Sequence, residues 1–314
     1  MLIVVSITVL LLAAAVTRMR PALESRRMRE AARAVNVYLG SARNRAMETG
    51  RSCGVILNPL SATLACALSI DQCEIPAPYC GDAVQSLALV TLSAANTITA
   101  TLDAADSPYK LLRQFDQMQL NYQGPYFPIQ NPNDQTSTDP EYLFIKTPVS
   151  GSWTLTLDAT GQSVPWTAAT MSVPYRIRRS PGKGVATPLQ LPASTVIDLN
   201  FSGIDNGTLF NSGSVIILFS PNGGIDCVWV NGSQSYVSRP IFLLVGKRER
   251  VGNAAVPSQT ADNRPLWANW QDLENVWVMI NPQTGLITTG EVASAATISD
   301  SRTLARDAQS LGGR

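Results

Sequence analysis

Histidine is absent from this chain of 314 residues, and its absence excludes several kinds of chemistry. Ser-His-Asp and Cys-His catalytic arrangements need an imidazole as general base, and many zinc sites use imidazole as a ligand. Carboxylate pairs such as Asp139 and Glu141 occur, but neither a nucleophile nor a set of metal ligands accompanies them. We therefore expect neither enzymatic activity nor a cofactor.

Cysteine is scarce, and no CxxC pair is present. Zinc sites built from thiolates usually contain such pairs, so the sequence disfavours a bound metal. Disulfides in an oxidising compartment are the better interpretation, with one cysteine left over and the pairing undetermined by the spacing. The candidate disulfide residues are Cys53, Cys66, Cys73, Cys80 and Cys227.

Charge is low and unevenly distributed, since 24 basic and 23 acidic residues give a net charge of +1. Nine arginines but only three acidic residues lie in residues 18–51, so the rest of the chain is net acidic. A basic segment next to an apolar one typically lies at a phospholipid surface.

A phosphate-binding loop is also missing, because the Gly-Lys pair in the basic loop at 176–184 lacks the GxxxxGK[ST] spacing.

The first sixteen residues form an almost unbroken apolar run, which only Ser6 and Thr8 interrupt. A transmembrane helix needs about 20 apolar residues, so the run is slightly short. A secretory signal would begin with basic residues and end at a cleavage site, and a core helix at a chain terminus would rarely be apolar all round. The residues alone leave these three interpretations open. The candidate membrane and assembly residues are Met1, Leu2, Ile3, Val4, Val5, Ile7, Val9, Leu10, Leu11, Leu12 and Val16.

The basic segment that follows has apolar residues at steps of four and three, which places them on one face of a helix. Gly50 is a suitable residue to end that helix. We therefore expect one helix over residues 1–50, apolar in its first third and roughly 70–75 Å long. The residues of this stripe are Met28, Ala32, Val35, Leu39, Ala42 and Ala46.

Beyond Gly50, β-branched runs alternate with Ser, Thr, Asn, Gly and Pro, which is typical of an antiparallel β domain. The expected fold class is α+β, with a long N-terminal helix followed by a mainly antiparallel β head. We expect the head at 51–293 with a long insertion at about 59–190, and an exposed polar tail at 294–314. Expected strands lie at 51–57, 83–102, 142–145, 153–157, 172–178 and 276–280.

Two further segments of the insertion have expected structures. Residues 59–82, which contain three of the cysteines, are expected to form a loop. Residues 107–119 are expected to form a short helix that packs on the core, because their apolar residues have helical spacing. Those residues are Leu111, Leu112, Phe115 and Met118.

Three turn signals occur in a fixed order in the C-terminal part of the chain. Leu191 and Pro192 precede an apolar strand, Pro-Asn-Gly-Gly follows the strand that ends at Ser220, and Pro-Gln-Thr-Gly separates the last two strands. Such sequences form turns between β-branched strands. This order, combined with a helix that ends in SARNRAMETGR, resembles type IV pilin-like proteins and in particular the GspH/FimT class of minor pseudopilins. The resemblance covers roughly residues 1–57 and 191–292, and the much longer middle departs from it.

The resemblance implies a structural subunit of a type II secretion pseudopilus or a type IV pilus. Its partners would be other pilin or pseudopilin subunits, with the N-terminal helices packed in the filament core and small alanines allowing close approach. It also implies a single-pass protein of the cell inner membrane with a periplasmic head, extracytoplasmic after assembly. In that family a basic leader with Gly-Phe-Thr-Leu-x-Glu precedes the apolar run. Prepilin peptidase processing and methylation are therefore implied only if such a leader lies upstream of Met1.

DNA binding is the alternative function, since some FimT-like minor pilins contribute to DNA uptake through basic residues near the C-terminus. The net acidic body disfavours it, because DNA binding relies on a concentrated positive charge. The candidate contacts are Arg176, Arg178, Arg179, Lys183, Lys247, Arg248, Arg250 and Arg314.

Overall fold

The computed structural model describes residues 2–61, 63–94, 97–103, 106, 108, 111–113, 115–130, 152–162, 170–205, 207–254 and 267–310, with side chains from Glu24 onward except at 93–94 and 309–310. The chain divides into two compact units. Unit 1 comprises Met1–Glu74 and Lys183–Arg314, and unit 2 comprises Ile75–Gly182. The long insertion of the sequence is therefore a compact unit, and its range is narrower than the expected 59–190.

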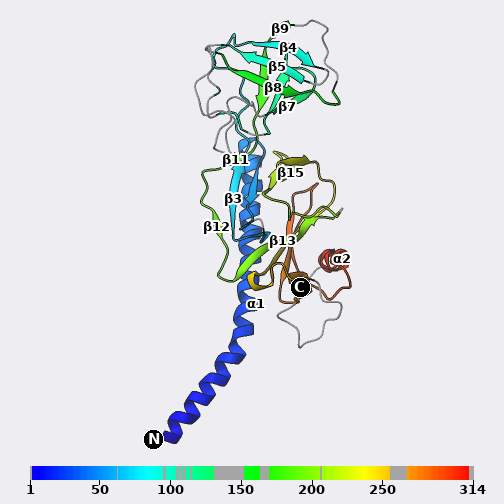
Figure 1. The fold of residues 1–314 in the computed structure, drawn as a ribbon. Coiled ribbons are helices and arrows are strands. Elements are labelled where there is room, and N and C mark those ends of the chain that lie inside the picture. Colours follow the sequence, from blue (N-terminus) through cyan, green and yellow to red (C-terminus); the bar gives the residue numbers. More distant parts are fainter. Residues whose placement is uncertain are drawn as a thin grey trace. The chain divides into compact units, whose positions relative to one another are not determined.

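Helix α1 (Leu2–Thr49) begins unit 1 (Figure 1). It ends where expected, since Gly50 has a φ of 65° and its amide donates to the carbonyl oxygen of Ala46 at 3.1 Å. Glycine adopts this left-handed conformation without steric cost, which is why it so often ends helices. An N-terminal helix followed by antiparallel β-sheets confirms the α+β fold class.

Unit 1 contains two antiparallel sheets. The strands of the first sheet are β1 (Cys53–Leu57), β3 (Ser69–Glu74), β11 (Gly182–Lys183), β12 (Leu189–Gln190), β14 (Val215–Phe219), β15 (Ile225–Val230) and β16 (Ser233–Ser235). Their order is β11-β3-β1-β14-β15-β16, and β12 pairs with β3. The strands of the second sheet are β2 (Cys66–Ala67), β13 (Thr195–Ile204), β17 (Ile241–Lys247), β18 (Val276–Ile280) and β19 (Ile287–Glu291). Their order is β19-β18-β17-β13-β2.

The main core of unit 1 lies between α1 and these two sheets. The stripe of α1 packs with alternate residues of the strands, including Val55 and Leu57 of β1 and Val278 of β18. Two-residue alternation places such residues on one face of a sheet. Strands β17 and β18 are buried along their whole length, because their other face is covered as well.

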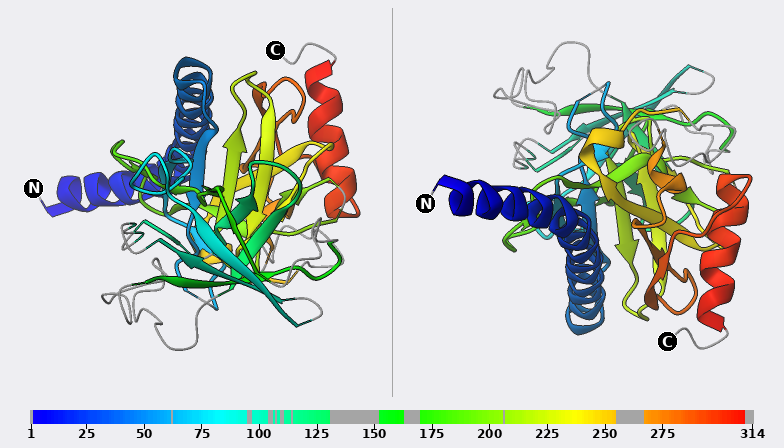
Figure 2. Two further views of the ribbon diagram at one scale, coloured as in Figure 1. Left: turned by 90° about the horizontal axis from the view of Figure 1, so that it is seen from above. Right: turned by 90° about the horizontal axis from the view of Figure 1, so that it is seen from below.

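Helix α2 (Ile298–Ser310) belongs to that second cover, together with the short helix η3 (Asn269–Gln271). Phe242, Trp277 and Ala305 lie in one buried cluster, and the Trp277 Nε1 donates to Ser301 Oγ at 3.1 Å. Figure 2 shows α1 and α2 on opposite sides of the second sheet. The exposed tail expected at 294–314 is therefore wrong in part, because Ser301 and Ala305 are buried, whereas many of its other described residues are exposed.

The turn signals of the C-terminal half lie where the sequence predicts them. Strand β13 follows Pro192, the β14–β15 hairpin turns at Ser220–Gly224, and the β18–β19 hairpin turns around Pro282. Strand β1 confirms the strand expected at 51–57. The loop expected at 59–82 is wrong in part, because Cys66 and Cys73 lie within strands β2 and β3.

Unit 2 is a seven-stranded antiparallel sheet around its own core. Its strands are β4 (Ala88–Ala94), β5 (Thr97–Leu102), β6 (Gln117–Leu120), β7 (Tyr126–Gln130), β8 (Thr154–Asp158), β9 (Thr170–Val173) and β10 (Tyr175–Arg178). Their order is β10-β6-β7-β8-β5-β4-β9. Only Pro174 separates β9 from β10, so the two ends of the sheet meet and it curves around one core.

The strands expected at 83–102 and 153–157 are confirmed, while 172–178 is divided by Pro174 into β9 and β10. The helix expected at 107–119 is wrong, because Gln117–Leu120 is strand β6 and the described residues before it form turns. Leu112 and Met118 are buried as expected, but Phe115 is exposed. The strand expected at 142–145 lies outside the described residues.

Candidate functional site

The stripe of α1 is buried by the chain's own sheets. Met28 and Ala32 are each 2% exposed, and the side chains of Val35, Leu39, Ala42 and Ala46 are fully buried. The same cluster contains core residues of both sheets. The interpretation of this stripe as a surface for neighbouring subunits is therefore wrong, because the head already covers it. The periodicity identified the buried face of the helix but not its partner.

The opposite face of α1 is exposed and is here called the outer face, defined by Arg26, Glu30, Arg33 and Val37. Val37 is 67% exposed. A shallow cavity of about 390 Å³ adjoins it, lined by Glu30, Arg33, Ala34, Val37, Tyr38, Ser41 and Leu189. The outer face thus combines paired charges with a small apolar patch, as exposed parts of subunit interfaces often do.

The C-terminal end of α1 is fixed by contacts to the two turns that the sequence predicted. The Arg43 Nε donates to the carbonyl oxygen of Gly223 at 2.9 Å. A Cβ atom on Gly285 would lie 1.8 Å from that same oxygen, so the two turns approach closely only because Gly285 has no side chain. Arg45 adds an ion pair to Glu74 at 3.1 Å. The helix is therefore tied to the ends of two hairpins as well as packed on the sheets.

At the other end of α1, Glu24 is the first residue whose side chain is described, and it belongs to a cluster of charged side chains. The Lys247 Nζ lies 2.6 Å from Glu274 Oε2, 3.2 Å from Asp272 Oδ2 and 3.3 Å from Glu24 Oε2. Arg250 Nη1 lies 2.7 Å from Asp272 Oδ2. Burial alone lowers the pKa of Lys247, but the hydrogen bond to Glu274 and the charge of Asp272 outweigh it, so the pKa is raised. Through Glu24 this cluster links α1 to β17.

These ion pairs bear directly on the candidate DNA contacts. Lys247 and Arg250 are buried and paired with carboxylates, which removes them as phosphate ligands. Lys183 pairs with Asp71 at 2.9 Å. The candidates are also divided, since Arg176, Arg178 and Arg179 belong to unit 2, whereas Lys183, Lys247, Arg248 and Arg250 belong to unit 1. Arg314 lies outside the described residues.

None of the five cysteines forms a disulfide, so the expected disulfides are wrong. Cys53, Cys66, Cys73 and Cys227 are buried in the sheets of unit 1, whereas Cys80 belongs to unit 2. Burial raises the pKa of the Cys73 thiol, and the neighbouring Cys53 adds to the effect. A buried protonated thiol behaves as a small apolar group, so these cysteines serve the core. Among the described residues no group of side chains could hold a metal ion.

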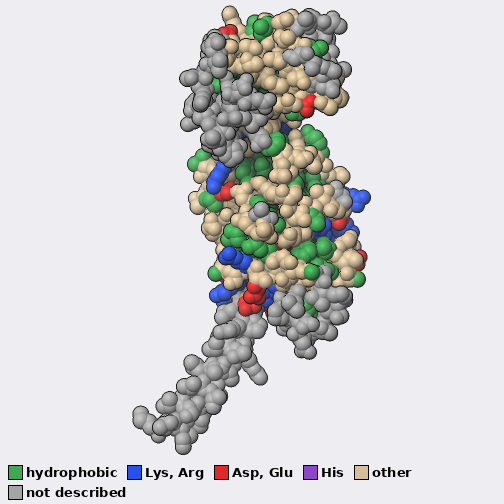
Figure 3. Space-filling model, in the orientation of Figure 1, with side chains coloured by type: hydrophobic (Ala, Val, Ile, Leu, Met, Phe, Trp, Pro, Cys, Tyr) green, Lys and Arg blue, Asp and Glu red, His purple; other side chains and the backbone are tan. Residues whose placement is uncertain are grey.

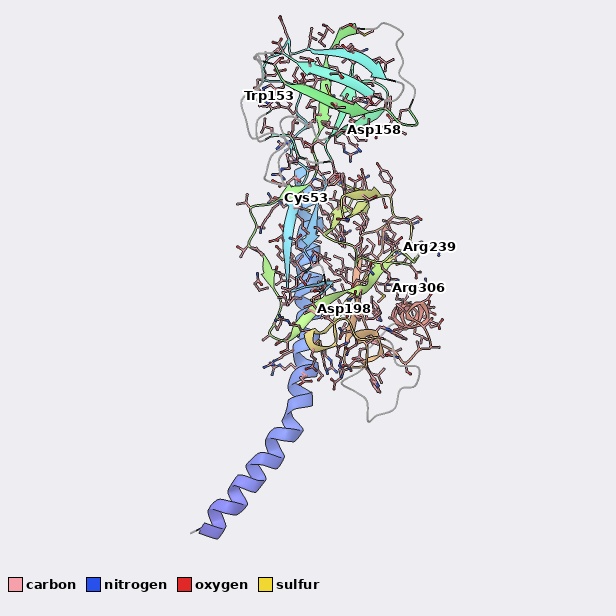
Figure 4. The ribbon with its side chains drawn as sticks, viewed as in Figure 1. Cys53, Trp153, Asp158, Asp198, Arg239 and Arg306 are labelled. Atoms are coloured by element: carbon pink, nitrogen blue, oxygen red, sulfur yellow. The ribbon has the colours of Figure 1, made fainter. Side chains whose placement is uncertain are left out.

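A buried polar network lies next to the charge cluster and was not predicted from the sequence. The Asn269 Nδ2 donates to Asp198 Oδ2 at 2.7 Å, and the Lys247 amide donates to Asn269 Oδ1 at 2.9 Å. Asn275 Nδ2 donates to the carbonyl oxygen of Asn269 at 2.7 Å. Burial raises the pKa of Asp198, which lies on β13 in the interior of unit 1 (Figure 4). The network positions η3 and the strand end that carries Lys247, and only the cluster of Asn and Asp after Trp267 hinted at it.

The apolar run at residues 1–16 lies outside the residues whose side chains are described. Within the described part of the chain, no helix combines the length and the apolar character that a membrane crossing requires. Comparison with protein-family models, with curated proteins and with solved structures found no match for this chain.

Proposed function

We propose that this chain is a structural minor subunit of a pilin-like filament, of the type II secretion or type IV pilus kind, held in the inner membrane by its N-terminal helix before assembly. The observation that carries the proposal is the continuity of α1. One helix extends from the apolar run of the sequence into the core of a β-rich unit. This arrangement suits a subunit that anchors by one end of a helix and presents a folded head at the other.

The contacts of α1 support a mechanical role for the helix. The stripe, the Arg43 contact and the Lys247 cluster fix the described half of α1 to unit 1 at several points along its length. A helix held in this way transmits force between its apolar end and the head without turning relative to it. Extraction from a membrane during filament assembly demands such a connection.

The outer face supports a role in contacts between subunits. The sheets of unit 1 already cover the stripe. Neighbouring subunits would therefore contact residues 24–49 of α1 through the outer face, at Arg26, Glu30, Arg33 and Val37. Arg26 and Glu30 are spaced four residues apart and lie 3.8 Å from each other. Opposite charges along one helix face set the register of a neighbouring helix more than they add affinity. The head would be periplasmic, with prepilin peptidase as a partner if a leader precedes Met1.

Cysteine cross-linking tests the proposal on the full chain. Val37→Cys places a thiol on the outer face, and Leu304→Cys places one on α2, where the side chain is also exposed. Both are made with Cys80→Ser, because Cys80 is the native cysteine that is not buried. We expect the Val37→Cys chain to form covalent multimers in the membrane and filament fractions, and the Leu304→Cys control to remain monomeric.

Two results would contradict the proposal. Recovery of the full chain only in the soluble fraction would exclude the anchoring role. Equal cross-linking of both cysteines would exclude a specific role for the outer face. The DNA-binding alternative has less support, because Lys247 and Arg250 are already paired with carboxylates.

A further inference from the structure

A polar cavity lies where the described side chains of α1 begin. Its volume is about 440 Å³. Three segments of unit 1 line it, namely α1, the turn that precedes β13, and the short helix η1 (Arg248–Arg250) with the end of β17. Figure 3 shows basic and acidic side chains close together at this end of the unit. The lining residues that carry charge are Glu24, Arg27, Lys247, Arg248 and Glu249.

The charges of this cavity fall into two groups. Lys247 is surrounded by Glu24, Asp272 and Glu274 and is therefore already satisfied. Arg27, Arg248 and Glu249 are exposed, and none of the three forms an ion pair with another described residue. The cavity therefore offers two guanidinium groups and one carboxylate to a ligand.

The backbone holds these groups in place. The Arg248 amide donates to the carbonyl oxygen of Ser194 at 3.0 Å, which joins η1 to the turn before β13. Arg250, two residues on, is anchored to Asp272. The segment that carries Arg248 and Glu249 is thus fixed at both ends while their side chains remain exposed, so little ordering of the backbone would accompany binding.

Because the cavity contains both positively and negatively charged side chains, it favours a zwitterionic ligand. A guanidinium group binds a phosphate with two parallel hydrogen bonds, and a carboxylate accepts hydrogen bonds from a primary ammonium group. Phosphoethanolamine carries both of these groups a few bonds apart. Phosphocholine lacks the ammonium hydrogens, and phosphoglycerol lacks the positive charge.

The distance along α1 places the cavity near a membrane surface. Glu24 lies eight positions after Val16, the end of the apolar run. At about 1.5 Å per residue this is roughly 12 Å of helix. The headgroup layer on one side of a bilayer is roughly 5–8 Å thick. If the apolar run lies in the hydrocarbon, the cavity therefore lies several ångströms beyond the headgroup layer, a gap that the long side chains of Arg27 and Arg248 would have to span.

We propose that this cavity binds the phosphoethanolamine headgroup of a membrane phospholipid, with Arg27 and Arg248 on the phosphate and Glu249 on the ammonium group. The inference rests on the proposed membrane anchoring of the chain. Headgroup binding gives the head a second attachment beside α1, so it fixes the rotation of the head about the helix axis. Before assembly, the head of such a subunit therefore has one rotational orientation about the helix axis instead of many.

The test uses the full chain in vesicles of phosphatidylcholine that contain equal amounts of either phosphatidylethanolamine or phosphatidylglycerol. Native mass spectrometry after release from the vesicles measures which lipid remains bound. We expect several-fold more retention of phosphatidylethanolamine than of the other two lipids. Free phosphoethanolamine added in excess should displace it.

Two variants and one control connect the preference to the cavity. Arg248→Ala and Glu249→Gln should each reduce retention of phosphatidylethanolamine about twofold to fivefold, the range for partly exposed charge pairs. Arg26→Ala removes the same charge from α1 outside the cavity and should leave retention unchanged. All three side chains are exposed, so circular dichroism should show an intact fold.

The outcomes separate this inference from the proposed function. Insertion of the chain into all vesicles without a preference for phosphatidylethanolamine would overturn the headgroup site alone. Equal retention of phosphatidylglycerol would also overturn it, because it would reveal general attraction of anions. Binding of free phosphoethanolamine without retention of the lipid would exclude a membrane source. Failure to insert into any vesicle would overturn both proposals.

Discussion

Units 1 and 2 are both built from antiparallel strands, but they form their cores in different ways. The core of unit 1 needs α1, whose stripe fills the space between two sheets. The core of unit 2 is enclosed by one sheet that curves around it, and the described residues of that unit contain no helix. Unit 1 is also assembled from two separate parts of the chain, whereas unit 2 is continuous. The N-terminal helix therefore belongs to the core of unit 1, and none of its described residues belongs to the core of unit 2.

The largest expected effect comes from truncating one core at a time. Leu39 of α1 and Leu157 of β8 are both fully buried. Leu→Ala at either site should cost about 2–5 kcal/mol of unfolding free energy, since it leaves a cavity. Denaturant unfolding followed by hydrogen exchange should show that Leu39→Ala weakens only unit 1 and Leu157→Ala only unit 2. Equal weakening of both units by Leu39→Ala would show that they unfold together.

The Lys247 cluster should account for the next largest effect, and only in unit 1. Lys247→Met leaves Asp272 and Glu274 without their shared cation and should cost about 3 kcal/mol. The same change at Lys183, whose side chain is 58% exposed, should cost less than about 1 kcal/mol. Chemical denaturation of both variants beside the parent chain measures the difference. A similar loss in the two variants would mean that burial does not strengthen the Lys247 pairs.

The pH dependence of the Lys247 contribution follows from its raised pKa. The stabilisation is fully present below the ordinary lysine pKa of 10.5 and is lost as pH rises through the higher folded value. Unfolding curves recorded at increasing alkaline pH should therefore lose stability sooner in the parent than in Lys247→Met. Parallel curves would contradict the assignment.

One buried carboxyl group in each unit should give a smaller effect of opposite sense. Burial raises the pKa of Asp198 in unit 1 and of Asp116 in unit 2. Each group takes up a proton on folding between its ordinary pKa of 3.8 and its raised value, so acidification through that window should stabilise its own unit. Asp198→Asn and Asp116→Asn should each remove this pH dependence from its own unit. Stability curves of both variants over mildly acidic pH provide the measurement.

The smallest effect on stability is expected on the outer face of α1, which belongs to neither core. Val37→Thr should change the unfolding free energy by less than about 0.5 kcal/mol, because the side chain is exposed. It should nevertheless reduce recovery of the chain in filaments if this face meets a neighbouring subunit. Thermal unfolding and filament yield are measured on the same preparations. A large loss of stability would show that Val37 supports the fold of unit 1.

Local signals explain which parts of this fold the sequence could predict. The turns at Ser220–Gly224 and around Pro282 depend on short stretches of Pro, Asn and Gly, and they lie where expected. The period of the α1 stripe correctly identified a buried face. The helix expected at 107–119 failed because Leu112 and Met118 have helical spacing by coincidence and reach the same core from a turn and a strand.

Contacts between distant segments explain the parts that could not be predicted. The Lys247 cluster brings together residues from α1, β17 and the segment after η3, and nothing in the local sequence of any one of them requires the others. Helix α2 was missed because few of its residues are strongly apolar, and its burial depends on Ala305 and Ser301 fitting against Trp277. The covering of the stripe by the chain's own sheets likewise depends on strands far along the sequence.

The place where unit 2 enters unit 1 has a consequence for the order of folding. Strands β3 and β11 are neighbours in the first sheet, and the Gly184 amide donates to the carbonyl oxygen of Gln72 at 2.7 Å. Unit 2 also brings its own ends together, since Tyr79 and Ile177 exchange backbone hydrogen bonds at 2.9 and 2.7 Å. Once unit 2 has folded, the long loop that β3 and β11 must close becomes a short one, and the entropy cost of closing it falls. The folding of unit 2 therefore makes it easier for β3 and β11 to pair in the first sheet of unit 1.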